Sequence, residues 1–187
     1  MKYLIAGLGN IGIEYHNTRH NIGFKILDAL AAASNISFSV LRYGALAEYK
    51  YRGKTLILLK PSTYMNLSGR AVNYWLNKEK INIENMLVLV DDVAMPFGKL
   101  RLRLRGSDGG HNGLLNINQV LGHQNYARLR FGIGSEFEFG NQIDYVLGEW
   151  TSEQEKMIPE RIKTAIDIIH SYVSNGRERT MNLYNNK

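Results

Sequence analysis

Polar side chains with useful chemistry are concentrated in one loop near the start of the chain. The loop from residue 7 to residue 20 contains Asn10, Tyr15, His16 and His20. Histidine ordinarily titrates near neutral pH, so a histidine here could act as a general base. His16 and His20 are four residues apart, but no carboxylate lies between them as in H-E-x-x-H, and no third ligand is evident. We therefore predict a histidine base and no metal.

A carboxylate that could serve such a base follows the most apolar segment of the chain. Residues 86–90 form an unbroken apolar run that ends in Asp91 and Asp92. A carboxylate paired with a histidine fixes the tautomer of the ring and stabilises the imidazolium. A cap on a turn or a helix is the alternative for these aspartates, and the sequence leaves it open.

The same N-terminal loop also matches a nucleotide-binding pattern, but its context is wrong. Residues 7–12 read G-x-G-x-x-G. That fingerprint requires a helix that opens on the glycines and an acidic residue at the end of a second strand. Here the predicted helix begins only after His20, and Asp28 falls inside it. We therefore do not expect a dinucleotide site.

Basic residues alternate with leucines later in the chain. Lys99, Arg101, Arg103 and Arg105 are separated by single leucines. In a strand this period of two places all four cations on one face. The face could be an edge that resists aggregation through like charges, but contact with phosphates would relieve the repulsion, and we favour it. Arg103 is the first candidate and Arg130 the second, in a chain whose net charge is +6.

The elements that must position these residues alternate along the chain. Hydrophobic patterns predict strands at 2–6, 46–51, 54–60, 86–90, 99–105 and 129–134, and helices at 21–33, 67–76, 114–121 and 152–175. This order predicts one α/β domain over residues 1–187, with a mixed, largely parallel twisted sheet and helices on both faces. Loops 7–20, 61–66, 91–98 and 106–112 each follow a strand, so some of them should converge on one crevice.

The C-terminal region gives weaker predictions. Ser152 and Glu155 have the spacing of a capping box at the start of the last long helix, and Pro159 is expected to start or kink it. The polar tail 177–187 should be only partly ordered. The chain has no cysteine, and no apolar run approaches the roughly 20 residues needed to cross a bilayer. We therefore expect neither a disulfide nor a membrane anchor.

Taken together, these segments resemble bacterial peptidyl-tRNA hydrolases. The resemblance rests on GLGNIGIEYHNTRHNIGF at 7–24, KPSTYMNLSG at 60–69, the aspartate pair with PFGKLRLR at 91–103, GSDGGHNGL at 106–114 and RLRFGIG at 128–134. It implies that His20 is the general base, that Asp91 steadies it, and that Asn10 positions the substrate. It also implies substrate contacts at the following residues: Tyr15, Tyr64, Met65, Asn66 and Asn112.

The resemblance implies a function as well as a site. The expected reaction is hydrolysis of the ester between peptide and tRNA in peptidyl-tRNA released from ribosomes, so that the tRNA is recycled. The expected enzyme is a cytoplasmic monomer that needs no cofactor. Segment 135–140 departs from the family pattern because it is acidic and aromatic, where relatives carry proline and basic residues. A non-catalytic RNA-binding module is the alternative, but it leaves the expected pairing of His20 with Asp91 unexplained.

Overall fold

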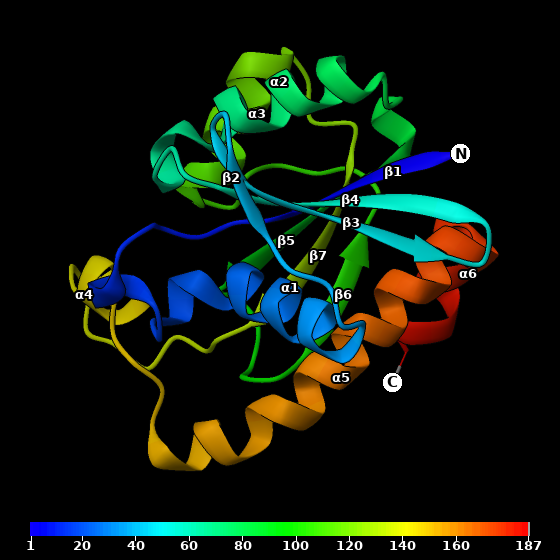
Figure 1. The fold of residues 1–187 in the computed structure, drawn as a ribbon. Coiled ribbons are helices and arrows are strands. Elements are labelled where there is room, and N and C mark those ends of the chain that lie inside the picture. The colour runs from blue at the N-terminus through cyan, green and yellow to red at the C-terminus, as the bar shows by residue number, and fades with distance from the viewer. Residues whose placement is uncertain (187) are drawn as a thin grey trace.

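One sheet organises the molecule. The structure is a computed structural model, and it describes residues 1–186. Within these residues seven strands form a sheet in the order β2-β3-β4-β1-β5-β7-β6 (Figure 1). The strands are β1 (Lys2–Gly7), β2 (Ser39–Leu41), β3 (Gly44–Tyr51), β4 (Lys54–Pro61), β5 (Met86–Asp92), β6 (Leu100–Arg103) and β7 (Ala127–Gly132). The four central strands β4, β1, β5 and β7 are parallel, and the flanking pairings are antiparallel. The predicted mixed, largely parallel sheet is confirmed.

Helices cover both faces of the sheet, as the sequence predicts. The helices are α1 (Ile22–Ala33), α2 (Ser68–Glu79), α3 (Asn112–Leu121), α4 (Gln142–Val146), α5 (Ser152–Asn175) and α6 (Arg177–Tyr184). In Figure 1, α2 and α3 lie on one side of the sheet, and α1 and α5 lie on the other. The sequence patterns missed β2 and α4, which are among the shortest elements.

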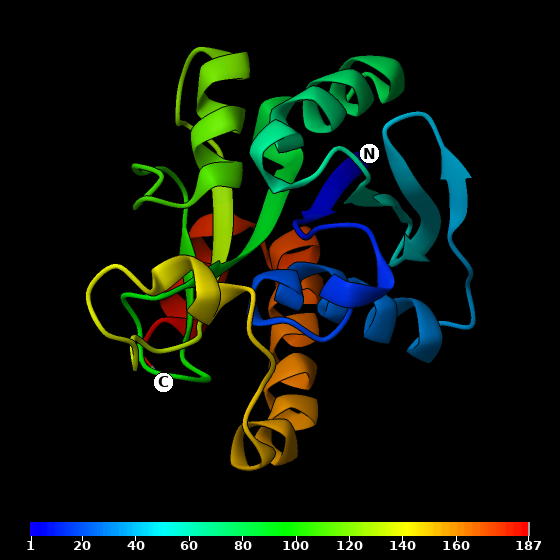
Figure 2. The ribbon, with the colours of Figure 1, turned by 90° about the vertical axis from the view of Figure 1, so that its left-hand side faces the viewer.

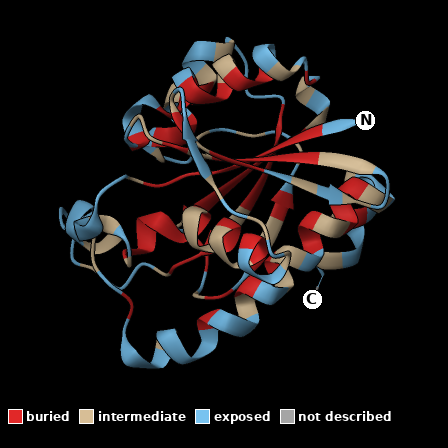
Figure 3. Ribbon diagram, viewed as in Figure 1, coloured by how far each residue is buried: buried red, intermediate tan, exposed pale blue. Residues whose placement is uncertain are grey.

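Alternation of side chains along the central strands builds two cores. In β5, Leu87 and Leu89 pack toward α1 and α5, whereas Val88 and Val90 pack toward α2 and α3. Both sets are almost completely inaccessible to solvent, as expected for a parallel strand covered on both faces (Figure 3). The predicted burial of this run is therefore confirmed.

The carboxyl ends of β1, β4 and β5 meet at the edge of the sheet that faces the viewer in Figure 2. Helix α1 starts close to this edge because it carries Gly23. A Cβ atom at Gly23 would lie 2.5 Å from the backbone nitrogen of Leu8 and 2.7 Å from the carbonyl oxygen of Leu89. A side chain there would push α1 away from β1 and β5, and His20, three residues before Gly23, would move with it.

The predicted capping box in the C-terminal region is wrong by one residue, and one of the two predicted roles of Pro159 is excluded. The capping box uses Thr151 and Gln154, one residue earlier than Ser152 and Glu155, because Thr151 is extended and Ser152 is already helical. Pro159 lies inside α5 and does not start it.

The tail is better ordered than its polar composition predicts. Residues 177–184 form α6, in which Thr180 is buried. Asn185 accepts a hydrogen bond from the backbone nitrogen of Leu102 at 2.8 Å and donates one to the Leu102 oxygen at 2.9 Å. Its side-chain amide thus replaces the missing neighbour of the edge strand β6. Lys187 lies outside the described residues.

The basic strand is shorter than predicted. Strand β6 covers only Leu100–Arg103, so Lys99 and Arg105 lie outside it. Leu100 and Leu102 are buried, and Arg101 and Arg103 point to the other side. The predicted division of the faces is correct within the strand.

Candidate active site

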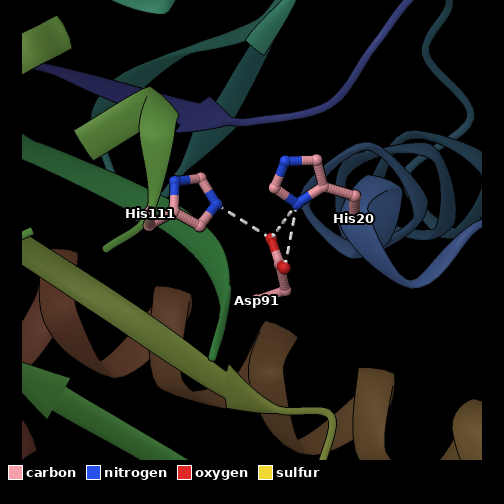
Figure 4. A group of neighbouring side chains, drawn as sticks. All are labelled: His20, Asp91 and His111. Carbon is pink, nitrogen blue, oxygen red and sulfur yellow. Dashed lines mark hydrogen bonds and ion pairs between the residues drawn. The ribbon is translucent and has the colours of Figure 1, made fainter. Parts of the chain in front are cut away.

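Two residues far apart in the sequence meet at the carboxyl end of β5. His20 lies in the 3-10 turn Arg19–Asn21 just before α1, and Asp91 is near the end of β5. The Nδ1 atom of His20 lies 2.9 Å from both carboxylate oxygens of Asp91 (Figure 4). Both side chains are buried, with 10% and 3% of their surface exposed. The structure thus places the two residues as the sequence led us to expect.

A second histidine, His111, contacts the same carboxylate from the glycine-rich loop. Its Nε2 lies 2.9 Å from Oδ1 of Asp91. Its Nδ1 accepts hydrogen bonds from the backbone nitrogens of Gly113 at 3.1 Å and Leu114 at 3.3 Å, so that His111 caps α3. An accepting Nδ1 carries a lone pair, so the ring proton must be on Nε2. His111 is therefore a neutral donor to Asp91 while this cap is formed.

The sequence reasoning missed His111. It singled out the neighbouring Asn112 and interpreted the glycine-rich segment as a turn. The available signal was a histidine three residues before a predicted helix, in a loop expected to reach the same crevice as Asp91.

The orientation of His20 leaves one ring nitrogen unused. Because an ionised Asp91 only accepts hydrogen bonds, Nδ1 of His20 must carry a proton, which places the lone pair of the neutral ring on Nε2. Within residues 1–186, Nε2 makes no hydrogen bond to the protein. In Figure 4 this nitrogen points away from Asp91. This is the arrangement in which a histidine can take a proton from a bound molecule.

Burial and charge have opposite effects on the pKa values of Asp91 and His20. Burial favours the neutral carboxyl of Asp91, but the two imidazoles outweigh it and hold the pKa of Asp91 well below its usual range. Burial also lowers the pKa of His20, yet the Asp91 carboxylate and its hydrogen bond more than compensate, so the pKa of His20 is raised from 6.5. Asp91 therefore remains ionised at neutral pH and strengthens His20 as a base.

Asn10 is held through both its backbone and its side chain, and one of its partners, Asn21, directly follows His20. Its backbone nitrogen and oxygen bond to the side-chain amide of Asn21 at 2.8 and 2.9 Å. Its Oδ1 accepts a hydrogen bond from the backbone nitrogen of Met65 at 2.7 Å. Within residues 1–186 the Nδ2 group of Asn10 has no hydrogen-bond acceptor, so this side chain offers a donor while its oxygen is engaged. Asn21, which fixes Asn10, was not recognised from the sequence.

A small cavity of about 70 Å³ adjoins the His20–Asp91 pair. His111 and Asn112 contribute to its wall on the side of α3, and Ile143 contributes from α4. Arg130 also lines it, donating to the carbonyl oxygen of Ser107 at 2.9 Å and lying 3.5 Å from Asp92. Arg130 is therefore largely engaged within the protein.

The other predicted substrate residues, Tyr15, Tyr64, Met65 and Asn66, are not among those that line this cavity. Met65 is buried, and Asn66 is exposed in the same 3-10 turn, Met65–Leu67, with no capping hydrogen bond from its side chain. Asn66 does not cap α2, because Leu67 is the residue that precedes that helix. Tyr15 is half-buried in the N-terminal loop, whereas Tyr64 is 53% exposed.

Arg19 ties the neighbouring helix α4 to the His20 turn. It donates to the carbonyl oxygen of Tyr145 at 3.1 Å, and its guanidinium lies 4.2 Å from the centre of the Tyr145 ring. Tyr145 in turn donates to the carbonyl oxygen of Ile133 at 2.6 Å. Helix α4, which contributes one wall of the cavity, is therefore fixed to Arg19, the residue next to His20.

The three side chains at the centre also have the composition of a metal site. The ligand atoms of His20, Asp91 and His111 lie within 4.8 Å of one another. A metal would need lone pairs on the two ring nitrogens that face Asp91, but both carry protons in the hydrogen-bond pattern described above. A lone pair on Nε2 of His111 would require the ring proton to move to Nδ1, and that would break the cap of α3. We therefore interpret the cluster as a hydrogen-bonded triad.

Comparison with known proteins identifies a family over nearly the whole chain. The family model described as peptidyl-tRNA hydrolase matches residues 4–187. A peptidyl-tRNA hydrolase of Phocaeicola vulgatus is 63% identical over 187 residues, covering all of both chains. One of Caldanaerobacter subterraneus is 42% identical and covers 98% of this chain and 99% of its own.

A solved structure agrees with the sequence comparison. The crystal structure of peptidyl-tRNA hydrolase from Acinetobacter baumannii superimposes with a TM-score of 0.92 at 34% identity. The match covers 98% of this chain and 94% of that one.

The Asp91→Asn substitution should lower the pKa of His20 below the ordinary value for histidine. In the native protein the carboxylate outweighs burial, and without its charge the effect of burial remains. NMR titration of the His20 ring in both proteins measures the shift. An unchanged pKa would show that Asp91 does not control this ring.

The His111→Asn variant is the matched control. Asparagine is a good helix cap, so α3 should persist, while the donor to Asp91 is lost. Because Asp91 remains charged, the pKa of His20 should stay above 6.5 in this variant.

Proposed function

This chain belongs to the peptidyl-tRNA hydrolase family, and we propose that it hydrolyses the ester between peptide and tRNA through a water molecule activated by His20. The observation that carries the proposal is the buried Asp91–His20 pair, in which Nε2 is left free. The free amide of Asn10, close by, supplies a group that can recognise a peptide.

The proposed reaction follows from the protonation states. Nε2 of His20 takes a proton from water, and the water oxygen bonds to the ester carbonyl carbon. The resulting tetrahedral oxyanion is stabilised by side-chain amides, for which Asn66 and Asn112 are available because neither side chain is bonded within the described protein. The bond to the ribose oxygen then breaks, and the imidazolium returns its proton to that oxygen. Asp91 stabilises the imidazolium throughout.

Asn10 can explain why a peptide, rather than a free amino acid, is required. Its Nδ2 group can donate only, so it suits the carbonyl oxygen of a peptide bond. A free aminoacyl ester has an ammonium group instead, which would face another donor and lose its water without a partner. The preference for a peptide over a free amino acid thus arises because Oδ1 of Asn10 is already hydrogen-bonded, which leaves only a donor for the substrate.

Contacts with the tRNA are proposed on the basic strand and on the exposed loops. Within residues 1–186, Arg103 makes no ion pair with a carboxylate, and it is exposed. Arg130 is a weaker candidate because it already bonds Ser107 and Asp92. Tyr15 and Tyr64 remain candidates for stacking against the bases of the tRNA.

The site offers less support to a non-catalytic RNA-binding module. Burying the carboxylate of Asp91 costs free energy that RNA binding at the surface would not require. The monomeric state and cytoplasmic location stay proposals. Both rest on the resemblance to bacterial peptidyl-tRNA hydrolases. Within residues 1–186 no helix is long and apolar enough to span a membrane.

The His20→Ala variant tests the function. Without the base, turnover of peptidyl-tRNA should fall by about 10²-fold or more, while the fold is retained. Release of free peptide from peptidyl-tRNA measures the rate, and a thermal unfolding curve checks the fold. A folded variant with full activity would refute the mechanism, and an inactive native protein would refute the function.

The Asn10→Asp variant tests the source of substrate discrimination. It keeps an oxygen for the backbone nitrogen of Met65 but replaces the donor with an anionic acceptor. Its kcat/KM for peptidyl-tRNA should fall by about tenfold, and the preference over aminoacyl-tRNA should narrow because the new charge attracts an ammonium. If the variant lowers kcat/KM for peptidyl-tRNA and aminoacyl-tRNA by the same factor, Asn10 does not discriminate between them.

The Arg103→Ala variant tests the basic strand. Loss of one phosphate contact should raise KM for the tRNA substrate and reduce the slope of log KM against log salt by about one charge. A short ester without the tRNA body should be unaffected. Lys156→Ala, an exposed cation on α5, is the control. Equal salt slopes for native protein and Arg103→Ala would exclude the contact.

A further inference from the structure

A surface groove larger than the cavity at His20 lies on the outer side of α2. Arg70, Asn73, Tyr74 and Asn77 are spaced three and four residues apart and share one face of the helix. Tyr43, from the turn between β2 and β3, and Val120, from α3, also line it, and the Tyr43 ring lies 5.4 Å from the ring of Tyr74. The volume of the groove is about 670 Å³, compared with 70 Å³ at His20. It is therefore large enough to hold part of a ligand.

The groove carries positive charge that the protein does not neutralise. Arg70 and Lys78 line it, and Arg42 lies beside it. Among residues 1–186, none of these three forms an ion pair with a carboxylate, and no carboxylate lines the groove. The Arg42 guanidinium lies 5.0 Å from the ring of Tyr43 and 5.2 Å from that of Tyr74. Cations held near each other without a counter-charge favour an anionic ligand.

The turn between β2 and β3, which lines the groove, has an unusual backbone conformation at Tyr43. Tyr43 has a φ of 63°, in the left-handed region that bulky residues rarely adopt. Two hydrogen bonds hold the turn: Trp75 donates to the carbonyl oxygen of Arg42 at 2.8 Å, and Ser62 donates to that of Tyr43 at 2.8 Å. Strained residues that are held in this way are concentrated at binding sites.

This turn is also connected to the active site. Ser62 lies in the loop that continues through Tyr64 to Met65, and the backbone nitrogen of Met65 fixes Asn10. Tyr64 is exposed, and its φ of 59° is left-handed too. The turn that lines the groove is therefore linked to Asn10 through one short loop.

We propose that the groove between α2 and the β2–β3 turn binds the phosphate backbone of the tRNA substrate. The inference rests on the proposed function, since it takes peptidyl-tRNA as the substrate. Peptidyl-tRNA has two parts, the tRNA and the peptide, and the positive charge of the groove favours the tRNA. Every tRNA carries phosphates, whereas the peptide varies in sequence and has no fixed charge. The groove lies toward β2 and the basic strand β6 lies at the other edge of the sheet, so the RNA is held on both sides of the site.

The Arg70→Gln/Lys78→Gln double variant tests this assignment. Both side chains are exposed, so the fold should be kept. KM for peptidyl-tRNA should rise by about fivefold or more, and the salt slope should fall by between one and two charges, with kcat and the hydrolysis of a short ester unchanged. The Lys156→Gln/Lys163→Gln double variant removes two exposed cations from α5 as the matched control.

Binding of deacylated tRNA supplies a readout that does not depend on catalysis. The groove variant should bind it more weakly than native protein, with the same reduction in salt slope. Equal affinity and equal slope would overturn the proposal even if the native protein is an active hydrolase. The proposal also fails if the defect appears only with acidic peptides attached to the same tRNA, because the groove would then bind peptide. An inactive native protein that binds tRNA through the groove would instead refute the hydrolase function alone.

Discussion

The site depends on one buried anion, the carboxylate of Asp91. An ionised carboxylate away from water is costly unless its oxygens accept hydrogen bonds. Here two imidazole N–H groups supply them, one from His20 before α1 and one from His111 before α3. Helices on opposite faces of the sheet are thereby fixed to the end of the same strand. Removal of the anion would leave two donors without their acceptor.

His20 and Asn10 share one arrangement within residues 1–186. In each side chain one end is bonded inside the protein, and the other is left for a ligand. In His20, Nδ1 bonds Asp91 and Nε2 is free; in Asn10, Oδ1 bonds Met65 and Nδ2 is free. This arrangement fixes which group accepts and which donates before a substrate arrives. Such preorganisation is what makes polar groups effective in catalysis.

The sequence predicts those parts of the molecule that depend on local pattern. The apolar run of β5, the alternation of β6 and the loop that carries His20 follow from spacing alone. Partnerships between distant residues are harder to predict. His111 resembles a turn residue until Asp91 is placed 2.9 Å away, and Asn185 resembles part of a loose tail until it pairs with the edge of β6. The boundary of β6 was overestimated because the alternating pattern continues beyond the residues that pair with β7.

The neighbouring aspartates show how one strand end can serve two purposes. Successive side chains in a strand point in opposite directions, so Asp91 and Asp92 cannot have the same partners. Asp91 bonds the two histidines, whereas Asp92 lies 3.5 Å from Arg130. Arg130 also holds the carbonyl oxygen of Ser107, in the loop that leads to His111. A phosphate that approached Arg130 would compete with Asp92 for the guanidinium, and its effect would pass to the glycine-rich loop. Arg130 of β7 therefore links Asp92 at the end of β5 to the loop that leads to His111.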